Sequence, residues 1–124
     1  MQLEQQHTRD NYINNYSEDS ITINGINYRS TVVVTPKQVF TDWPIDSMAQ
    51  LNGEYCQRLI EFHPQVIIIG NEEGVTLLPP ELMHAFGRQG IGVECMPLDA
   101  ACRTYNLLVH EGRVVMGVLL LPAS

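Results

Sequence analysis

Positive charge is scarce in this sequence. Seven lysine and arginine residues stand against 14 aspartate and glutamate residues, which gives a formal net charge of -7, and Lys37 is the single lysine. A protein that binds nucleic acid needs a basic patch to neutralise phosphate groups, and no such patch is visible. We therefore expect no nucleic-acid partner. The acidic balance also disfavours adhesion to anionic membrane surfaces.

Long apolar segments are missing as well. The longest, Val114 to Leu121, has eight residues with Gly117 inside it, whereas a transmembrane helix needs about 20. The N-terminal segment contains neither the hydrophobic centre of a signal peptide nor the arginine-rich pattern of a transit peptide. The three cysteines, an odd number at wide spacing, indicate reduced thiols. These features predict a cytoplasmic protein without direct membrane insertion.

Catalytic and metal-binding motifs are absent too. The histidines and cysteines show no CxxC, HExxH or HxH spacing, and the chain has no GxSxG nucleophile turn. The segment GNEEG, residues 70–74, lacks the spacing of a phosphate-binding loop, and its two glutamates would repel phosphate. We therefore expect no cofactor, no metal and no catalytic residues.

The first half of the chain contains short β patterns. Residues 1–18 are polar and aperiodic, which predicts a mobile tail followed by one domain over residues 19–124. Asn24-Gly25 stands between two short alternating runs and predicts a β-hairpin, because both residues tolerate positive φ. Further short β segments follow before Trp43, and together they predict a small antiparallel layer.

The second half alternates strand and helix patterns. Continuous apolar runs predict buried strands. Segments with helical spacing predict helices, one of which begins after the N-cap residue Asn52 and another of which ends at Gly112. The order strand, helix, strand, helix, strand is typical of an α/β sheet whose strands are largely parallel. The sequence therefore predicts a single three-layer α/β domain.

The stretch ACRTYNLLVHEGR, residues 101–113, raises the question of a binding surface. A helical period of 100° per residue places Cys102 and Tyr105 on the arc that faces the sheet. The residues that project elsewhere are Arg103, Asn106, Leu107 and His110. This outer face is either a solvated polar surface or a contact surface for a protein partner or an anionic ligand.

A ligand crevice is the second candidate site. Open α/β sheets bind ligands at the carboxyl ends of their strands. Here that rule brings together Gly70, Asn71, Glu72 and Met96. The backbone amides at the starts of the helices near Glu81 and Asp99 are further places for a small anion.

Four segments, VIIIGNEEG, GIGVECM, AACRTYNLLVHEGR and VVMGVLLLP, resemble in order and spacing a small single-domain family. It contains the mitochondrial respiratory complex I assembly factor three and many uncharacterised bacterial proteins, and the resemblance covers about residues 20 to 122. The resemblance implies a mixed central sheet with helices on its faces and a small β layer. It implies no established enzymatic activity for the bacterial members and an assembly role through partner contacts for the mitochondrial ones. Two departures fall at strand ends: Gly70-Asn71-Glu72 replaces the usual Gly-Thr-Gly, and Pro97-Leu98 replaces Asp-Thr.

Two function hypotheses follow. The first is a non-catalytic protein-interaction module that aids assembly of a respiratory or other membrane-associated complex through the outer helix face. The second is a small-molecule-binding protein or enzyme that uses the crevice near Gly70 and Met96. The sequence predicts a protein partner without identifying it, and it leaves the oligomeric state open.

Overall fold

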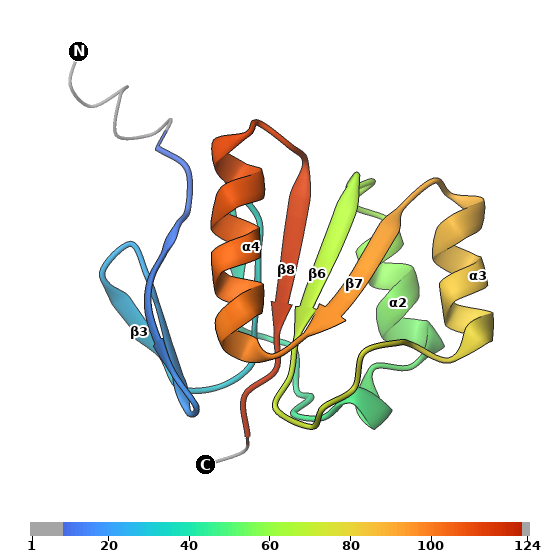
Figure 1. Ribbon diagram of the computed structural model, residues 1–124, viewed down its shortest axis with the longest axis horizontal. Coiled ribbons are helices and arrows are strands. Elements are labelled where there is room, and N and C mark those ends of the chain that lie inside the picture. The colour runs from blue at the N-terminus through green and yellow to red at the C-terminus, as the bar shows by residue number, and fades with distance from the viewer. Residues whose placement is uncertain (1–8, 123–124) are drawn as a thin grey trace.

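Two sheets organise residues 9–122, which are the residues that the computed structural model describes (Figure 1). A three-stranded antiparallel sheet has the order β1-β2-β3, and a five-stranded sheet has the order β5-β4-β8-β6-β7. In the larger sheet β6 runs parallel to β7 and β8, while β4 is antiparallel to β5 and β8. The strands are β1 (Ile13–Ser17), β2 (Ser20–Ile23), β3 (Ile26–Tyr28), β4 (Val32–Val34), β5 (Val39–Phe40), β6 (Val66–Gly70), β7 (Gly92–Met96) and β8 (Val115–Leu119).

Helices cover both faces of the larger sheet. α2 (Gly53–Ile60) and α3 (Pro80–Arg88) pack on one face, and α4 (Leu98–His110) packs on the other beside the small sheet. A short 3-10 helix, η1 (Met48–Gln50), precedes α2. All five residues of β6 are buried: Ile67 and Ile69 pack toward α2 and α3, and Ile68 packs toward α4. This three-layer arrangement, with its mixed sheet and small antiparallel layer, confirms the predicted fold class.

Local signals set the helix ends as expected. The side chain of Asn52 accepts hydrogen bonds from the backbone N–H groups of Glu54 and Tyr55, which confirms it as the N-cap of α2. Gly112 follows α4 with φ 78, a conformation that glycine adopts without strain. In the described part of the chain no helix is both long and apolar enough to cross a membrane.

The small sheet begins earlier in the chain than the sequence predicts. The sequence places residues 13–17 in the polar tail, but they form β1 and pair with β2, so this part of the prediction is wrong. The Asn24-Gly25 hairpin between β2 and β3 is confirmed, with φ 48 and φ 85 at the two turn residues. Residues 1–8, which belong to the predicted tail, lie outside the described residues.

The segments before Trp43 divide between the two sheets. The sequence groups β4 and β5 with the small antiparallel layer, but β4 pairs with β8 and extends the central sheet. Every residue of β4 is buried, so both faces of this strand must be covered by other parts of the protein. A position in the central sheet meets this need, because that sheet has other layers packed on both of its faces.

Candidate functional site

The outer face of α4 is the first candidate surface, and the structure divides its residues. Asn106 accepts a hydrogen bond from the Ile13 N–H at 2.9 Å through Oδ1 and donates one to the Ile13 carbonyl at 2.8 Å through Nδ2. This amide therefore pairs with β1 as a neighbouring strand would, across 93 positions of sequence. Its polar atoms serve the fold and are not presented to a partner.

Arg103 also leans toward the small sheet but stays accessible. Its Nη1 donates to the Tyr16 hydroxyl at 3.3 Å and lies 3.7 Å from the Asp99 carboxylate, one helical turn away. Both members of this ion pair are more than half exposed, so it contributes little to stability. The charge of Arg103 therefore remains available to an anionic group on a partner.

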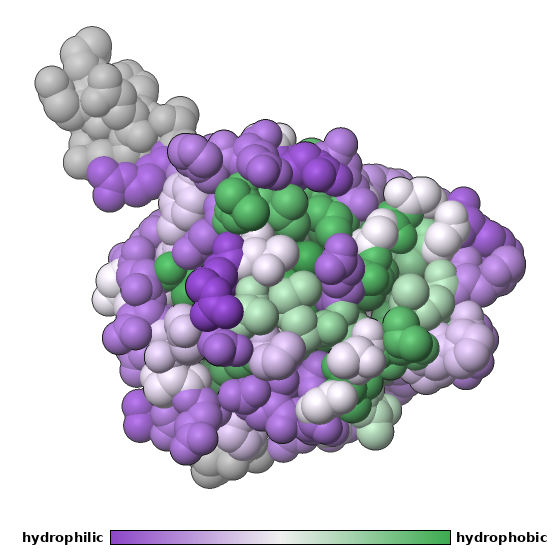
Figure 2. Space-filling view, in the orientation of Figure 1, coloured by the Kyte–Doolittle hydropathy of each residue, from purple (hydrophilic) through white to green (hydrophobic). Residues whose placement is uncertain are grey.

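Leu107 and His110 complete the accessible part of α4. Leu107 is 55% exposed, and His110 is exposed at the last position of the helix. Figure 2 shows apolar surface on the face that carries α4, inside a largely polar border. We call Arg103, Leu107 and His110 the α4 surface. It combines an exposed leucine with an arginine, which is the mixture that protein interfaces favour.

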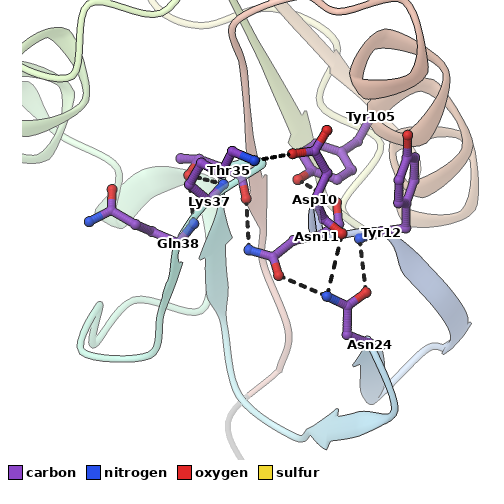
Figure 3. A network of polar contacts seen from close by, with 8 residues as sticks. All are labelled: Asp10, Asn11, Tyr12, Asn24, Thr35, Lys37, Gln38 and Tyr105. Atoms are coloured by element: carbon purple, nitrogen blue, oxygen red, sulfur yellow. Dashed lines mark hydrogen bonds and ion pairs between the residues drawn. The ribbon is translucent and has the colours of Figure 1, made fainter. Parts of the chain in front are cut away.

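Tyr105 lies on the opposite side of α4 and anchors the start of the small sheet. Its ring is fully buried, and its hydroxyl donates to the Asn11 carbonyl at 3.1 Å. Asn11 extends this contact: its side chain donates to the Thr35 carbonyl at 3.0 Å, as Figure 3 shows. Its backbone N–H donates to the Pro36 carbonyl at 2.8 Å. Burial, with Asp10 and Tyr12 nearby, raises the pKa of the Tyr105 hydroxyl, so the group stays a neutral donor.

The three thiols are unsuited to nucleophilic chemistry at neutral pH. Burial raises the pKa of Cys102 to about 12, with Asp99 and Glu72 adding to the rise and Arg103 opposing it. Burial also raises the pKa of Cys56 to about 11, with a contribution from Cys95, and it raises the pKa of Cys95 itself. Since the thiolate is the reactive form, these thiols behave as small apolar groups.

The predicted crevice residues do come together, but mainly as a packed junction. A Cβ atom on Gly70 would lie 2.8 Å from the Cβ of Ala101, so this glycine lets α4 approach the sheet. Asn71 is buried, and its backbone N–H donates to the Met96 carbonyl at 3.0 Å. Its side chain donates to the Val75 carbonyl at 2.9 Å and accepts from the backbone N–H groups of Glu73 and Val75.

Glu72 occupies one of the helix starts that the sequence offers to a small anion. Its carboxylate lies 3.5 Å from the backbone nitrogen of Leu98, the first residue of α4. A carboxylate at this position is stabilised by the helix dipole and leaves an external anion facing a negative charge. Glu73 acts in the same way at η1, where it accepts from the Met48 N–H at 2.7 Å.

A cleft of about 600 Å³ opens beside this junction. Leu120 and Pro122, which follow β8, form part of its wall, and the remaining lining residues are acidic: Glu18, Asp19, Asp46, Glu72 and Glu73. We call it the acidic cleft. Of the predicted crevice residues only Glu72 lines it. Glu73 is the neighbour of Glu72 in the loop after β6. The other three carboxylates come from the β1–β2 turn and from the segment before η1, and no local sequence signal connects those segments with this loop.

The electrostatics of the acidic cleft favour cations. Five carboxylates around one cleft give a negative potential, which attracts positive ligands and repels anions. Within residues 9–122, no group of three or more histidine, cysteine, aspartate or glutamate side chains is arranged to hold a metal ion. This negative potential suits an organic cation or a basic side chain.

Comparisons with known proteins connect this chain to a family without an assigned function. The family model described as "Protein of unknown function (DUF498/DUF598)" matches residues 13–120. The mouse protein named NADH dehydrogenase [ubiquinone] 1 alpha subcomplex assembly factor 3 is 30% identical over 113 residues, which are 90% of this chain and 60% of the mouse protein. The 13 kDa major membrane protein of Francisella tularensis is 28% identical over 111 residues, which are 88% of this chain and 89% of that protein.

A solved structure shares the whole arrangement. The crystal structure of a Bordetella parapertussis protein superposes with a TM-score of 0.84 at 30% identity, over 93% of this chain and 98% of that one. The chain spans about three fifths of the length of the assembly factors that it matches. The likeness to those factors is therefore a likeness to one part of them.

Proposed function

Because the chain belongs to the DUF498/DUF598 family, we propose that it is a protein-interaction module that aids assembly of a larger, membrane-associated complex in the cytoplasm. The observation that carries this proposal is the 30% identity to a complex I assembly factor over 90% of the chain. The Francisella relative that is named a membrane protein is consistent with a complex at a membrane. The burial of the thiols and the occupation of the Asn71 amide by its own loop also favour a role without catalysis.

We assign the partner contact to the α4 surface. Leu107 supplies an apolar side chain that is 55% exposed in the free protein, and burying that exposed part on binding is favourable by about 1–1.5 kcal/mol, roughly half the value for a fully exposed leucine. Arg103 lies one helical turn before it and adds a planar donor group for a carboxylate. Asn106 is left out of this surface because its amide is paired with Ile13.

The test is partner recovery from the native host. A tagged Arg103→Glu/Leu107→Glu variant should lose the proteins that copurify with the wild type, because it places two negative charges on the α4 surface. Both side chains are exposed, so the melting temperature should stay within about 3 °C of the wild type.

A matched control makes the same two changes elsewhere. Arg88→Glu/Leu77→Glu replaces an exposed arginine and a leucine that is 71% exposed, both away from α4, and should keep the partners. Unchanged recovery with the α4 variant would refute the proposal. Light scattering after gel filtration shows whether the recovered partner is a second copy of this chain.

The second candidate function is small-molecule binding in the acidic cleft. It is favoured by the position of the cleft at the carboxyl ends of β6 and β8, where α/β sheets usually bind ligands, and by its volume of about 600 Å³. The ligand would carry positive charge. Spermidine and other organic cations should then raise the melting temperature of the wild type but not of Asp46→Asn/Glu72→Gln, and a panel without any shift would exclude this candidate.

A further inference from the structure

A separate groove of about 350 Å³ opens at the amino end of β8, away from the acidic cleft. The β4–β5 turn, the segment after α2 and the first residues of β8 form its walls. We call it the β8 groove. Its apolar lining includes Pro36, Phe62, Pro64 and Val114, while the neighbouring Val115 and Met116 have buried side chains.

Some of the apolar side chains that line the β8 groove are exposed to solvent. Phe62 is 38% exposed and Val114 is 51% exposed, and both belong to the small set of large apolar side chains that the described residues leave exposed. The Phe62 ring is held edge-on against Phe40, with ring centroids 5.2 Å apart. These apolar side chains are already in place, so the groove favours a ligand with an apolar body. Binding would bury apolar surface of the ligand and of the groove, and few protein side chains would have to lose conformational freedom.

Positive charge borders the β8 groove, although the chain as a whole is acidic. Lys37 and Arg113 line it, and none of its lining residues is acidic. The Lys37 ammonium lies 2.7 Å from the Asp10 carboxylate, a contact that Figure 3 shows. Arg113 donates from Nε to Gln65 Oε1 at 3.3 Å, and within residues 9–122 its guanidinium forms no ion pair. Its two terminal nitrogens therefore offer a pair of donors for a carboxylate.

We propose that the β8 groove binds a small amphipathic carboxylate, such as a medium-chain fatty acid. The chain of the ligand lies against Phe62 and Val114, and its carboxylate pairs with Arg113. The volume is near the lower end of the range for small-molecule pockets. An α-helix is about 10–12 Å across, so the groove has room for a side chain of a partner helix but not for the helix itself. This site goes beyond the proposed interaction function and does not use the α4 surface.

The experiment is a titration of the full chain with sodium decanoate below its micelle-forming concentration, followed by amide shifts in 15N-resolved NMR spectra. Saturable shifts are expected at the amides of Thr35, Lys37 and Gln38 and of residues 113–116. The uncharged 1-decanol should bind at least about fivefold more weakly, and decyltrimethylammonium should not bind at these residues, because Arg113 stabilises the anion and repels the cation.

Two pairs of variants keep the result interpretable. Arg113→Ala should raise the Kd for decanoate about three- to fivefold, because Arg113 is exposed and an exposed charged pair contributes modestly, whereas the exposed Arg88→Ala should not change it. Val114→Asp should abolish binding, whereas the similarly exposed Leu107→Asp should retain it. Lys37 is not varied, because its ammonium also holds Asp10.

Several results would overturn the proposal. These are equal binding of decanoate and decyltrimethylammonium, shifts that avoid residues 113–116, or an unchanged Kd in Arg113→Ala. An acetylated peptide of two leucines and two glutamates that saturates the groove when decanoate does not would assign it to a protein segment instead. A Leu107→Asp variant that binds decanoate but has lost its protein partners would separate this site from the α4 surface.

Discussion

Replacing Gly70 with alanine tests whether this glycine serves helix packing or a ligand. The added Cβ would lie 2.8 Å from the Cβ of Ala101, 3.0 Å from Leu98 Cδ1 and 3.3 Å from Leu119 Cδ2. Carbon atoms in contact are usually about 3.5–4.0 Å apart. The new methyl group must therefore push α4 away from β6 or force neighbouring side chains out of their rotamers.

The size of the effect follows from these distances. Overpacking of a well-packed core costs about 1–3 kcal/mol, and the closest neighbour here is the Cβ of a helix residue, which moves only with its backbone. We therefore expect Gly70→Ala to lower the free energy of unfolding by about 2–3 kcal/mol. Ala101→Gly alone should cost about 2 kcal/mol, because it loses helix propensity and a buried methyl group.

The double variant tests directly whether the two methyl groups compete for one space. In Gly70→Ala/Ala101→Gly the new methyl occupies the space of the old one, so the loss should be at least about 1 kcal/mol smaller than the sum of the single losses. Urea unfolding followed by the fluorescence of the buried Trp43 measures all three variants. Gly53→Ala is the control, because nothing lies within 4 Å of its added Cβ. Strict additivity, or a Gly70→Ala variant as stable as the wild type, would refute the packing role.

Three further perturbations probe the anchoring of the small sheet and the thiols. Tyr105→Phe removes the hydrogen bond to Asn11 and should lower the free energy of unfolding by about 1 kcal/mol. Tyr105→Ala also leaves a cavity in the core and should lower it by about 3–5 kcal/mol, as measured by thermal unfolding. Asn106→Ala should cost about 1–3 kcal/mol and speed hydrogen exchange at the Ile13 amide, and retained protection there would argue against this anchor. Stability should fall as pH rises above about 9, because the unfolded chain loses thiol protons near pKa 9.0 while folded Cys56 and Cys102 keep theirs until pH values near 11 and 12. A Cys102→Ala variant should show a shallower fall, and a wild type with constant stability up to about pH 10.5 would contradict the burial of these thiols.

Much of the fold is predictable because its signals are local. The apolar run of β6, the cap at Asn52 and the period of α4 each depend on residues within a few positions of one another. The buried arc of α4, including Cys102 and Tyr105, is predicted correctly for this reason. The tail prediction fails at β1, because the backbone of Ile13 is held by an amide 93 positions away.

The candidate sites are less predictable, since they depend on which segments meet. Asn71 and Asn106 have the polar side chains of binding residues, but both are occupied by backbone groups that only the fold brings near them. Conversely, Arg113 and Phe62 carry no site signal in the sequence. They line one groove because the segment after α2 and the start of β8 meet at the amino end of β8.

The sequence by itself determined the fold class, the helix boundaries and the buried face of α4, because hydrophobic periodicity and capping act over a few residues. Only the tertiary structure decided that β4 joins the central sheet, that five carboxylates from distant segments surround one cleft, and that the stretch from Ala101 to Arg113 contributes to separate surfaces. Strand pairing and side-chain convergence depend on contacts between residues far apart in the chain. Such contacts leave no local pattern in the sequence.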